Sequence, residues 1–85
     1  MSRVKVRRLG EGLHPSEVVV TVVTADGVEE EVSVHSGSLS GDTLEVGHPI
    51  SKAQGRVLVE LPRETARGFW RLWVPADAVT EEQAA

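Results

Sequence analysis

The chain has neither cysteine nor tyrosine, and its aromatic residues are one phenylalanine and two tryptophans. The absence of cysteine excludes disulfide frameworks, thiol chemistry and thiolate metal sites. It is compatible with a reducing cytosol, so we expect a cytoplasmic protein. Because aromatic residues are so few, the core of this 85-residue chain must consist of aliphatic side chains, chiefly valine.

Long apolar runs and a basic excess are also missing. No apolar run approaches the ~20 residues that span a bilayer, and the N-terminus "MSRVKVRRLGEG" lacks the apolar stretch of a secretory signal. We therefore expect no membrane contact. The formal net charge of -4 disfavours a general binder of phosphate backbones, which normally carries a basic excess. The length predicts a single domain over residues 1–85, in which residues 80–85 form a frayed tail or, as the alternative, a last short strand.

The dominant hydrophobic period is two residues, which is typical of half-buried β-strands. It runs through "RVKVRR", "VEEEVSVH" and "RVLVEL", while "EVVVTVVT" is β-branched almost throughout and predicts a central strand. These segments predict an all-β fold of six or seven short antiparallel strands, with one or two single helical turns at "PRETARG" and "PADAV". We expect a small barrel or a compact sandwich, and prefer the barrel because closure removes exposed sheet edges. No internal repeat is visible.

The sequence "ADG" predicts a hairpin between two of these strands. A two-residue turn of Asp26 and Gly27 would place valines opposite polar residues. A three-residue loop over 25–27, with Gly27 in the left-handed conformation, keeps the valines together. It predicts four cross-strand pairs: Val20 with Val32, Val18 with Val34, Val22 with Glu30, and Glu17 with His35. In this register we expect the Glu30 carboxylate to reach water near the hairpin tip.

All three aromatic residues lie within "GFWRLWVP" at 68–75. In a strand, alternation directs Trp70, Leu72 and Val74 to one face, which we assign to the core. The opposite face then carries Phe69, Arg71 and Trp73. The outer face of "EVVVTVVT" carries a second set of candidates: Val19, Thr21 and Val23.

Exposed apolar groups rimmed by charge are typical of protein interfaces. The two candidate sets therefore predict either a further packed layer of the same chain or a surface that binds a partner protein or a second copy. We expect a non-catalytic interaction module that needs no cofactor. The alternative function is single-stranded nucleic-acid binding, in which the rings of the aromatic strand stack on bases and neighbouring arginines contact phosphates. The acidic balance of the chain disfavours it.

Catalytic and metal-binding patterns are weak. His14, His35 and His48 lack the close spacing of local metal-ligand pairs, so we predict no metal site. Serines beside His35, with Glu17 as an orienting acid, suggest nucleophilic catalysis, but the strand–turn–helix elbow of such enzymes is missing. We therefore predict no enzymatic activity, unless a pocket collects His35, Glu17 and a serine.

Three parts of residues 41–80 carry a resemblance to a known fold: "GDTLEV", "RVLVEL" with "FWRLWVP", and "PADAV". Together they resemble Src-homology-3-like small barrels. The segment "GDTLEV" resembles the strand that follows their first long loop, and "RVLVEL" with "FWRLWVP" resembles their central hairpin. "PADAV" resembles the short helical turn before their final strand. The resemblance implies a small barrel. It implies no binding residue, because the peptide-binding members carry tyrosines and acidic residues in the long first loop, whereas this chain has no tyrosine.

Overall fold

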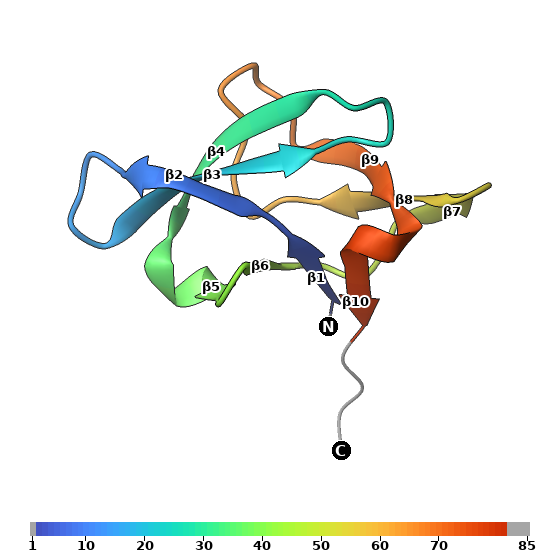
Figure 1. Cartoon of the computed structure of the whole chain (residues 1–85), viewed down its shortest axis with the longest axis horizontal. Helices are drawn as coiled ribbons and strands as arrows, with labels where there is room; N and C mark the ends of the chain where they lie inside the picture. Colours follow the sequence, from blue (N-terminus) through green and yellow to red (C-terminus); the bar gives the residue numbers. More distant parts are fainter. Residues whose placement is uncertain (1, 82–85) are drawn as a thin grey trace.

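The computed structural model describes residues 2–81, which form ten strands and two 3₁₀ turns in three antiparallel sheets (Figure 1). Sheet A contains β1 (Ser2–Lys5), β5 (Leu39–Ser40), β6 (Thr43–Val46) and β10 (Val79–Glu81). Sheet B contains β2 (Arg7–Glu11), β3 (Glu17–Val23) and β4 (Glu29–His35), and sheet C contains β7 (Ser51–Ala53), β8 (Arg56–Glu60) and β9 (Arg71–Pro75). The 3₁₀ turns are η1 (Ser36–Ser38) and η2 (Ala76–Ala78).

The all-β prediction is confirmed, and η2 forms at the predicted turn "PADAV". The closed barrel is not confirmed, because none of the three sheets closes on itself. The strands are also shorter and more numerous than predicted. Thr80 and Glu81 belong to β10 and pair with β1, so at these two positions the alternative of a last short strand holds and the frayed tail is wrong. Residues 82–85 lie outside the described part. Within that part, no helix is long and apolar enough to cross a membrane.

One apolar cluster fills the space between the sheets. Alternation is the reason, since every second side chain of the longer strands points inward. Thirteen aliphatic side chains are buried: Val4, Val6, Val20, Val22, Val32, Val34, Leu44, Val46, Val57, Val59, Leu61, Leu72 and Val74. Burying each one contributes about 1.5–3 kcal/mol, so valine packing takes the place of the missing aromatic core.

The β3–β4 hairpin has the predicted register, including all four predicted pairs. Thr24 N–H donates to the Val28 carbonyl at 2.8 Å, and Gly27 has a φ of 81°. One detail is wrong: Glu30 is 3% exposed and does not reach water freely. It occupies an inward position in the alternation of β4, and a later loop of the chain covers it.

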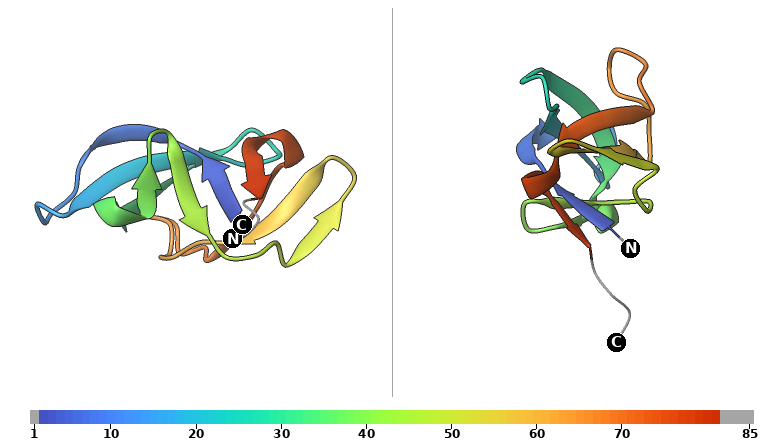
Figure 2. Two further views of the ribbon diagram at one scale, coloured as in Figure 1. Left: turned by 90° about the horizontal axis from the view of Figure 1, so that it is seen from below. Right: turned by 90° about the vertical axis from the view of Figure 1, so that its right-hand side faces the viewer.

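The order of elements repeats, although the sequence shows no repeat. Each half begins with a strand of sheet A, continues through a three-stranded sheet, and returns to sheet A by a 3₁₀ turn and a short strand. Strands β1 and β6 lie at the centre of sheet A, flanked by β10 and β5 (Figure 2). Equivalent residues lie 40 positions apart: Val4 and Leu44, Val32 and Leu72, Val34 and Val74, and Ser36 and Ala76 at the starts of the turns.

Candidate interaction surface

The loop over 61–70, between β8 and β9, carries two of the three aromatic residues. The side chains of Phe69 and Trp70 are 45% and 51% exposed. The prediction that Trp70 belongs to the core is wrong, because β9 begins only at Arg71 and the inward alternation starts with Leu72. We call residues 67–73 the aromatic segment.

Backbone contacts fix this loop against β4. Thr65 forms a bridge with Val32, and Ala66 N–H donates to the Glu31 carbonyl at 2.7 Å. Within the loop, Thr65 N–H donates to the Phe69 carbonyl at 2.9 Å, and Phe69 N–H donates to Thr65 Oγ1 at 3.2 Å. These bonds take the place of the helical turn predicted at "PRETARG". They hold the exposed rings on an ordered support.

Arg67 links the aromatic segment to a buried charge. Its Nη1 donates to Glu30 Oε2 at 3.1 Å, and the Glu30 side chain is only 4% exposed. Glu30 Oε1 is buried without a hydrogen-bond partner in the described residues. The Arg67 guanidinium also lies over the Phe69 ring, 5.4 Å from its centroid, in a cation–π contact. The sequence contained a signal for this pair, because Glu30 stands at an inward position among valines. The sequence analysis expected Glu30 to reach water and therefore missed the pair.

The outward face of β9 carries the other two predicted contact residues. Arg71 Nε donates to Glu60 Oε2 at 3.2 Å. Trp73 is half-buried opposite Leu58, with the Arg56 guanidinium 5.9 Å from its ring centroid. The structure thus places Phe69, Arg71 and Trp73 where none is sealed beneath a further layer.

Most arginines near the aromatic segment already bind a carboxylate. Besides the Arg67 and Arg71 pairs, Arg63 donates to Glu17 and thereby lowers the pKa of this carboxyl below its ordinary value of 4.5. Among the described residues, Arg56 has no ion-pair partner. The positive charge of this region is therefore largely neutralised within the chain.

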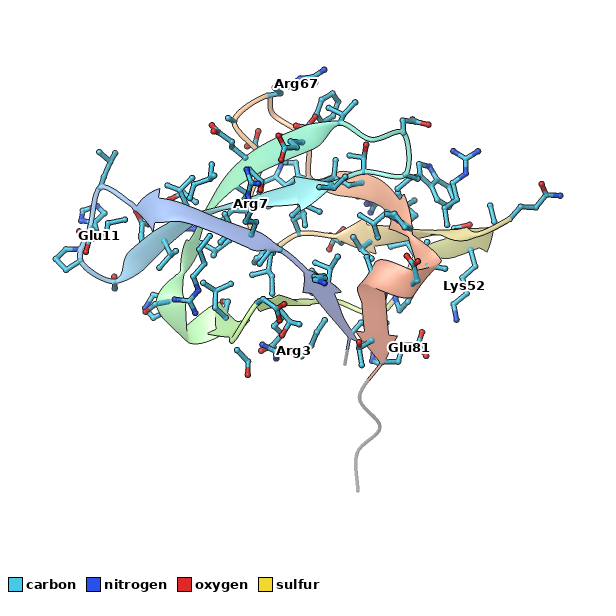
Figure 3. All side chains as sticks on the ribbon, in the orientation of Figure 1. Arg3, Arg7, Glu11, Lys52, Arg67 and Glu81 are labelled. Carbon is cyan, nitrogen blue, oxygen red and sulfur yellow. The ribbon has the colours of Figure 1, made fainter. Side chains whose placement is uncertain are left out.

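The second candidate set, on β3, is only in part a surface. Val23 is 46% exposed and Val19 is half-buried, but Thr21 is only 4% exposed although it lies on the outer face, so it offers no free surface. Thr21 lies between β2 and β4, whose longer side chains extend past it. Arg7 of β2, labelled in Figure 3, reaches across β3 to Glu29 of β4, with Nη2 3.6 Å from Oε1.

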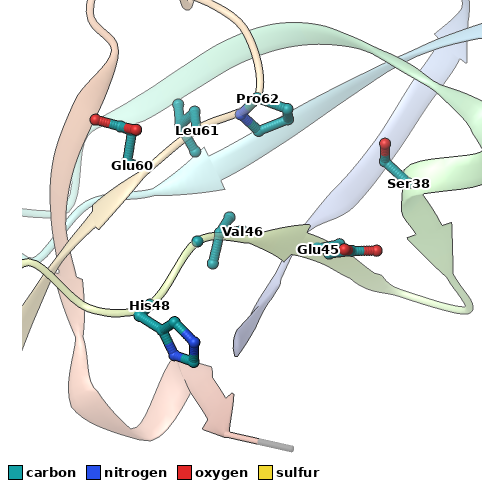
Figure 4. A pocket seen from close by; sticks show the side chains of 8 residues that line it. Ser38, Glu45, Val46, His48, Glu60, Leu61 and Pro62 are labelled. Atoms are coloured by element: carbon teal, nitrogen blue, oxygen red, sulfur yellow. The ribbon is translucent and has the colours of Figure 1, made fainter. Parts of the chain in front are cut away.

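The two side chains considered for catalysis, His35 and Glu17, each form a different contact. His35 Nδ1 accepts the Gly37 N–H at 3.0 Å, and Glu17 binds Arg63. Neither lines the cavity of about 470 Å³ in Figure 4, which is bounded by Ser38, Glu45, Val46, Gly47, His48, Glu60, Leu61 and Pro62. Within residues 2–81, no three histidine or acidic side chains are grouped so that they could hold a metal ion.

Comparison of the chain with protein-family models, with curated proteins and with solved structures gives no match. The function must therefore be inferred from the geometry of the chain itself. The feature that stands out is an ordered loop presenting two half-exposed aromatic rings beside paired charges.

Proposed function

We propose that the protein is a non-catalytic interaction module that binds another protein through the aromatic segment. The observation that carries the proposal is the half-exposure of Phe69 and Trp70 on a loop fixed by hydrogen bonds to β4 and within itself. Aromatic side chains supply large contact areas, and they often dominate the energy of binding. Because the loop is already fixed, it loses little conformational entropy on binding, and little of the interaction free energy is offset by that loss.

The charges of the same region favour a protein partner over a nucleic acid. Arg63, Arg67 and Arg71 each bind a carboxylate. A phosphate would have to displace these carboxylates, so the electrostatic gain that drives nucleic-acid binding is reduced. Polar pairs around exposed rings are typical of the rim of a protein interface.

The proposed setting of this module is the cytoplasm. The resemblance of residues 41–80 to Src-homology-3-like barrels is compatible with a binding role, but that family's peptide surface is not proposed here. Self-association through the aromatic segment is the competing version of the proposal, and sedimentation across a range of concentrations distinguishes the two.

The test is affinity capture from a cell extract followed by a quantitative binding assay with the recovered protein. We expect Trp70→Ala and Phe69→Ala to weaken binding about thirtyfold, as removal of an interface anchor does. Leu13→Ala is the matched control, because Leu13 is apolar and 98% exposed but lies in the β2–β3 loop. Binding should change little with salt. Equal binding by all variants, or recovery of nucleic acid with a steep salt dependence, would overturn the proposal.

A further inference from the structure

Two cavities lie next to each other on the outer face of sheet B and share part of their lining. Their volumes are about 310 and 230 Å³, and both are lined by Arg7, Thr21 and Glu29. We call them together the β3 groove, because Thr21 of β3 lies where they meet. The groove does not include the exposed rings of the aromatic segment.

Thr21 is the unusual residue of this groove. It is 4% exposed, and its Oγ1 has no hydrogen-bond partner in the described residues. Buried hydroxyl groups are normally satisfied, because an unpartnered one loses its hydration without compensation. The ion pair of Arg7 and Glu29 spans β3 beside it, with side chains 72% and 55% exposed. Exposed pairs of this kind are weak, so a ligand can displace the pair and bond to the hydroxyl.

The two ends of the groove differ in chemistry. Lys5 and four apolar residues are among those that line the smaller cavity, the apolar ones being Val6, Val23, Pro75 and Ala78. The larger cavity is more polar and includes Glu31. In the described part of the chain, neither Lys5 nor Glu31 has an ion-pair partner. Arg67 also lines the larger cavity, but it is paired with Glu30. The unpaired charges of the groove are therefore positive at its apolar end and negative at the other.

Strand geometry sets the spacing of a matching ligand. Val23 lies opposite Glu29, and Thr21 lies opposite Glu31, so the two rows of the groove are two residues apart along β3. An extended peptide has the same period, because its side chains i and i+2 point to one side. A peptide lying along β3 can therefore place one side chain in each cavity.

We propose that the β3 groove binds the C-terminal end of an extended peptide whose last residue is aliphatic and whose third-last residue is lysine or arginine. The aliphatic side chain enters the apolar cavity, and the terminal carboxylate pairs with Lys5. The basic side chain pairs with Glu31, and a peptide group bonds to the Thr21 hydroxyl. The groove shares Arg67 with the aromatic segment but includes neither Phe69 nor Trp70. Variants of the two rings therefore test the proposed function without changing the groove.

The first experiment is a nuclear magnetic resonance titration of the full chain with acetyl-Gly-Lys-Gly-Leu bearing a free carboxylate. We expect saturable shifts of the backbone amides of Thr21, Val23 and Glu31, while the side-chain indole signal of Trp70 stays unchanged. The same peptide with a C-terminal amide, or with glutamate in place of lysine, should bind about three to five times more weakly, because each change removes one exposed ion pair.

Variants of the protein test each contact. Thr21→Val keeps the shape of the side chain and removes the unpartnered hydroxyl, so it should preserve thermal stability while weakening peptide binding about fivefold. Glu31→Gln and Lys5→Gln should each weaken it by a similar factor. Glu64→Gln and Lys52→Gln are matched controls outside the groove and should leave the affinity unchanged.

Three results would overturn the inference. They are the absence of saturable groove shifts at millimolar peptide, equal affinity for the carboxylate and amide peptides, and groove shifts that follow protein concentration without peptide. The last result would identify a second copy as the occupant. Trp70→Ala separates this inference from the proposed function, because it should weaken binding of the partner protein about thirtyfold and leave peptide affinity unchanged.

Discussion

The two halves of the chain use the same order of elements but differ in one connection. In the first half, β3 and β4 are joined by the tight turn over 24–28. In the second half, β8 and β9 are joined by the longer loop over 61–70, which carries Phe69 and Trp70. The positions that the two halves share are buried valines and leucines, so the order of elements that they have in common forms the core. The difference lies in the loop to which we assign the proposed interaction, and binding residues commonly concentrate in loops held by a rigid scaffold.

The same comparison explains the buried glutamate. Position 30 in β4 corresponds to position 70 in the second half, by the same offset of 40 residues that relates Val32 to Leu72. The first half has an inward carboxylate there, and the second has an exposed tryptophan. The longer loop brings Arg67 onto Glu30. The charge in one half is therefore tolerated because the extra loop of the other half covers it.

The largest effect is expected where the two halves meet. Val4 and Leu44 pair across β1 and β6 and are both fully buried. Leu44→Ala should lower the free energy of unfolding by about 2–5 kcal/mol, because it removes buried surface and leaves a cavity. Urea denaturation followed by tryptophan fluorescence measures the change. Leu13→Ala, at a side chain 98% exposed, should have almost no effect. Equal losses for both variants would show that β1 and β6 are not the centre of the fold.

A smaller effect is expected at the contact between loop and buried charge. Arg67→Met leaves the Glu30 carboxylate buried without a partner and should lower the free energy of unfolding by about 1–3 kcal/mol. Adding Glu30→Gln should recover part of this loss, because a neutral amide is easier to bury. The matched control is Arg71→Met, whose partner Glu60 is 52% exposed, and it should cost less than about 1 kcal/mol. Equal stability of Arg67→Met and Arg71→Met would contradict the idea that the loop of the second half stabilises the buried Glu30 of the first half.

The smallest effect is a pH dependence at the pair of Arg63 and Glu17. The hydrogen bond from Arg63 lowers the pKa of Glu17 below 4.5, so the pair stabilises the fold above that pH. This contribution is lost as the pH falls through the lowered pKa and Glu17 takes up a proton. We expect Arg63→Gln to be less stable than the unmodified chain at pH 7, and the difference to shrink below about pH 4.5. Thermal unfolding at a series of pH values measures it, and a constant difference would contradict the assignment.

Much of the local structure could be predicted because it depends on short-range rules. The register of the β3–β4 hairpin follows from valine alternation and the left-handed glycine at position 27. The candidate site was only partly predictable. Alternation directed Phe69, Arg71 and Trp73 away from the core, and none of them is sealed beneath a further layer. It did not predict that Trp70 lies in a loop before β9 or that neighbouring side chains bury Thr21, because alternation does not say where a strand begins or what crosses over its outer face.

The sequence by itself determined the all-β character, the aliphatic core and one hairpin register, since these depend on side-chain period and turn chemistry along neighbouring positions. Only the tertiary structure decided that Arg67 covers Glu30 and that Arg7 and Glu29 enclose Thr21. Those contacts join residues from different strands and loops. Their partners are set by how the sheets pack, which no local pattern specifies.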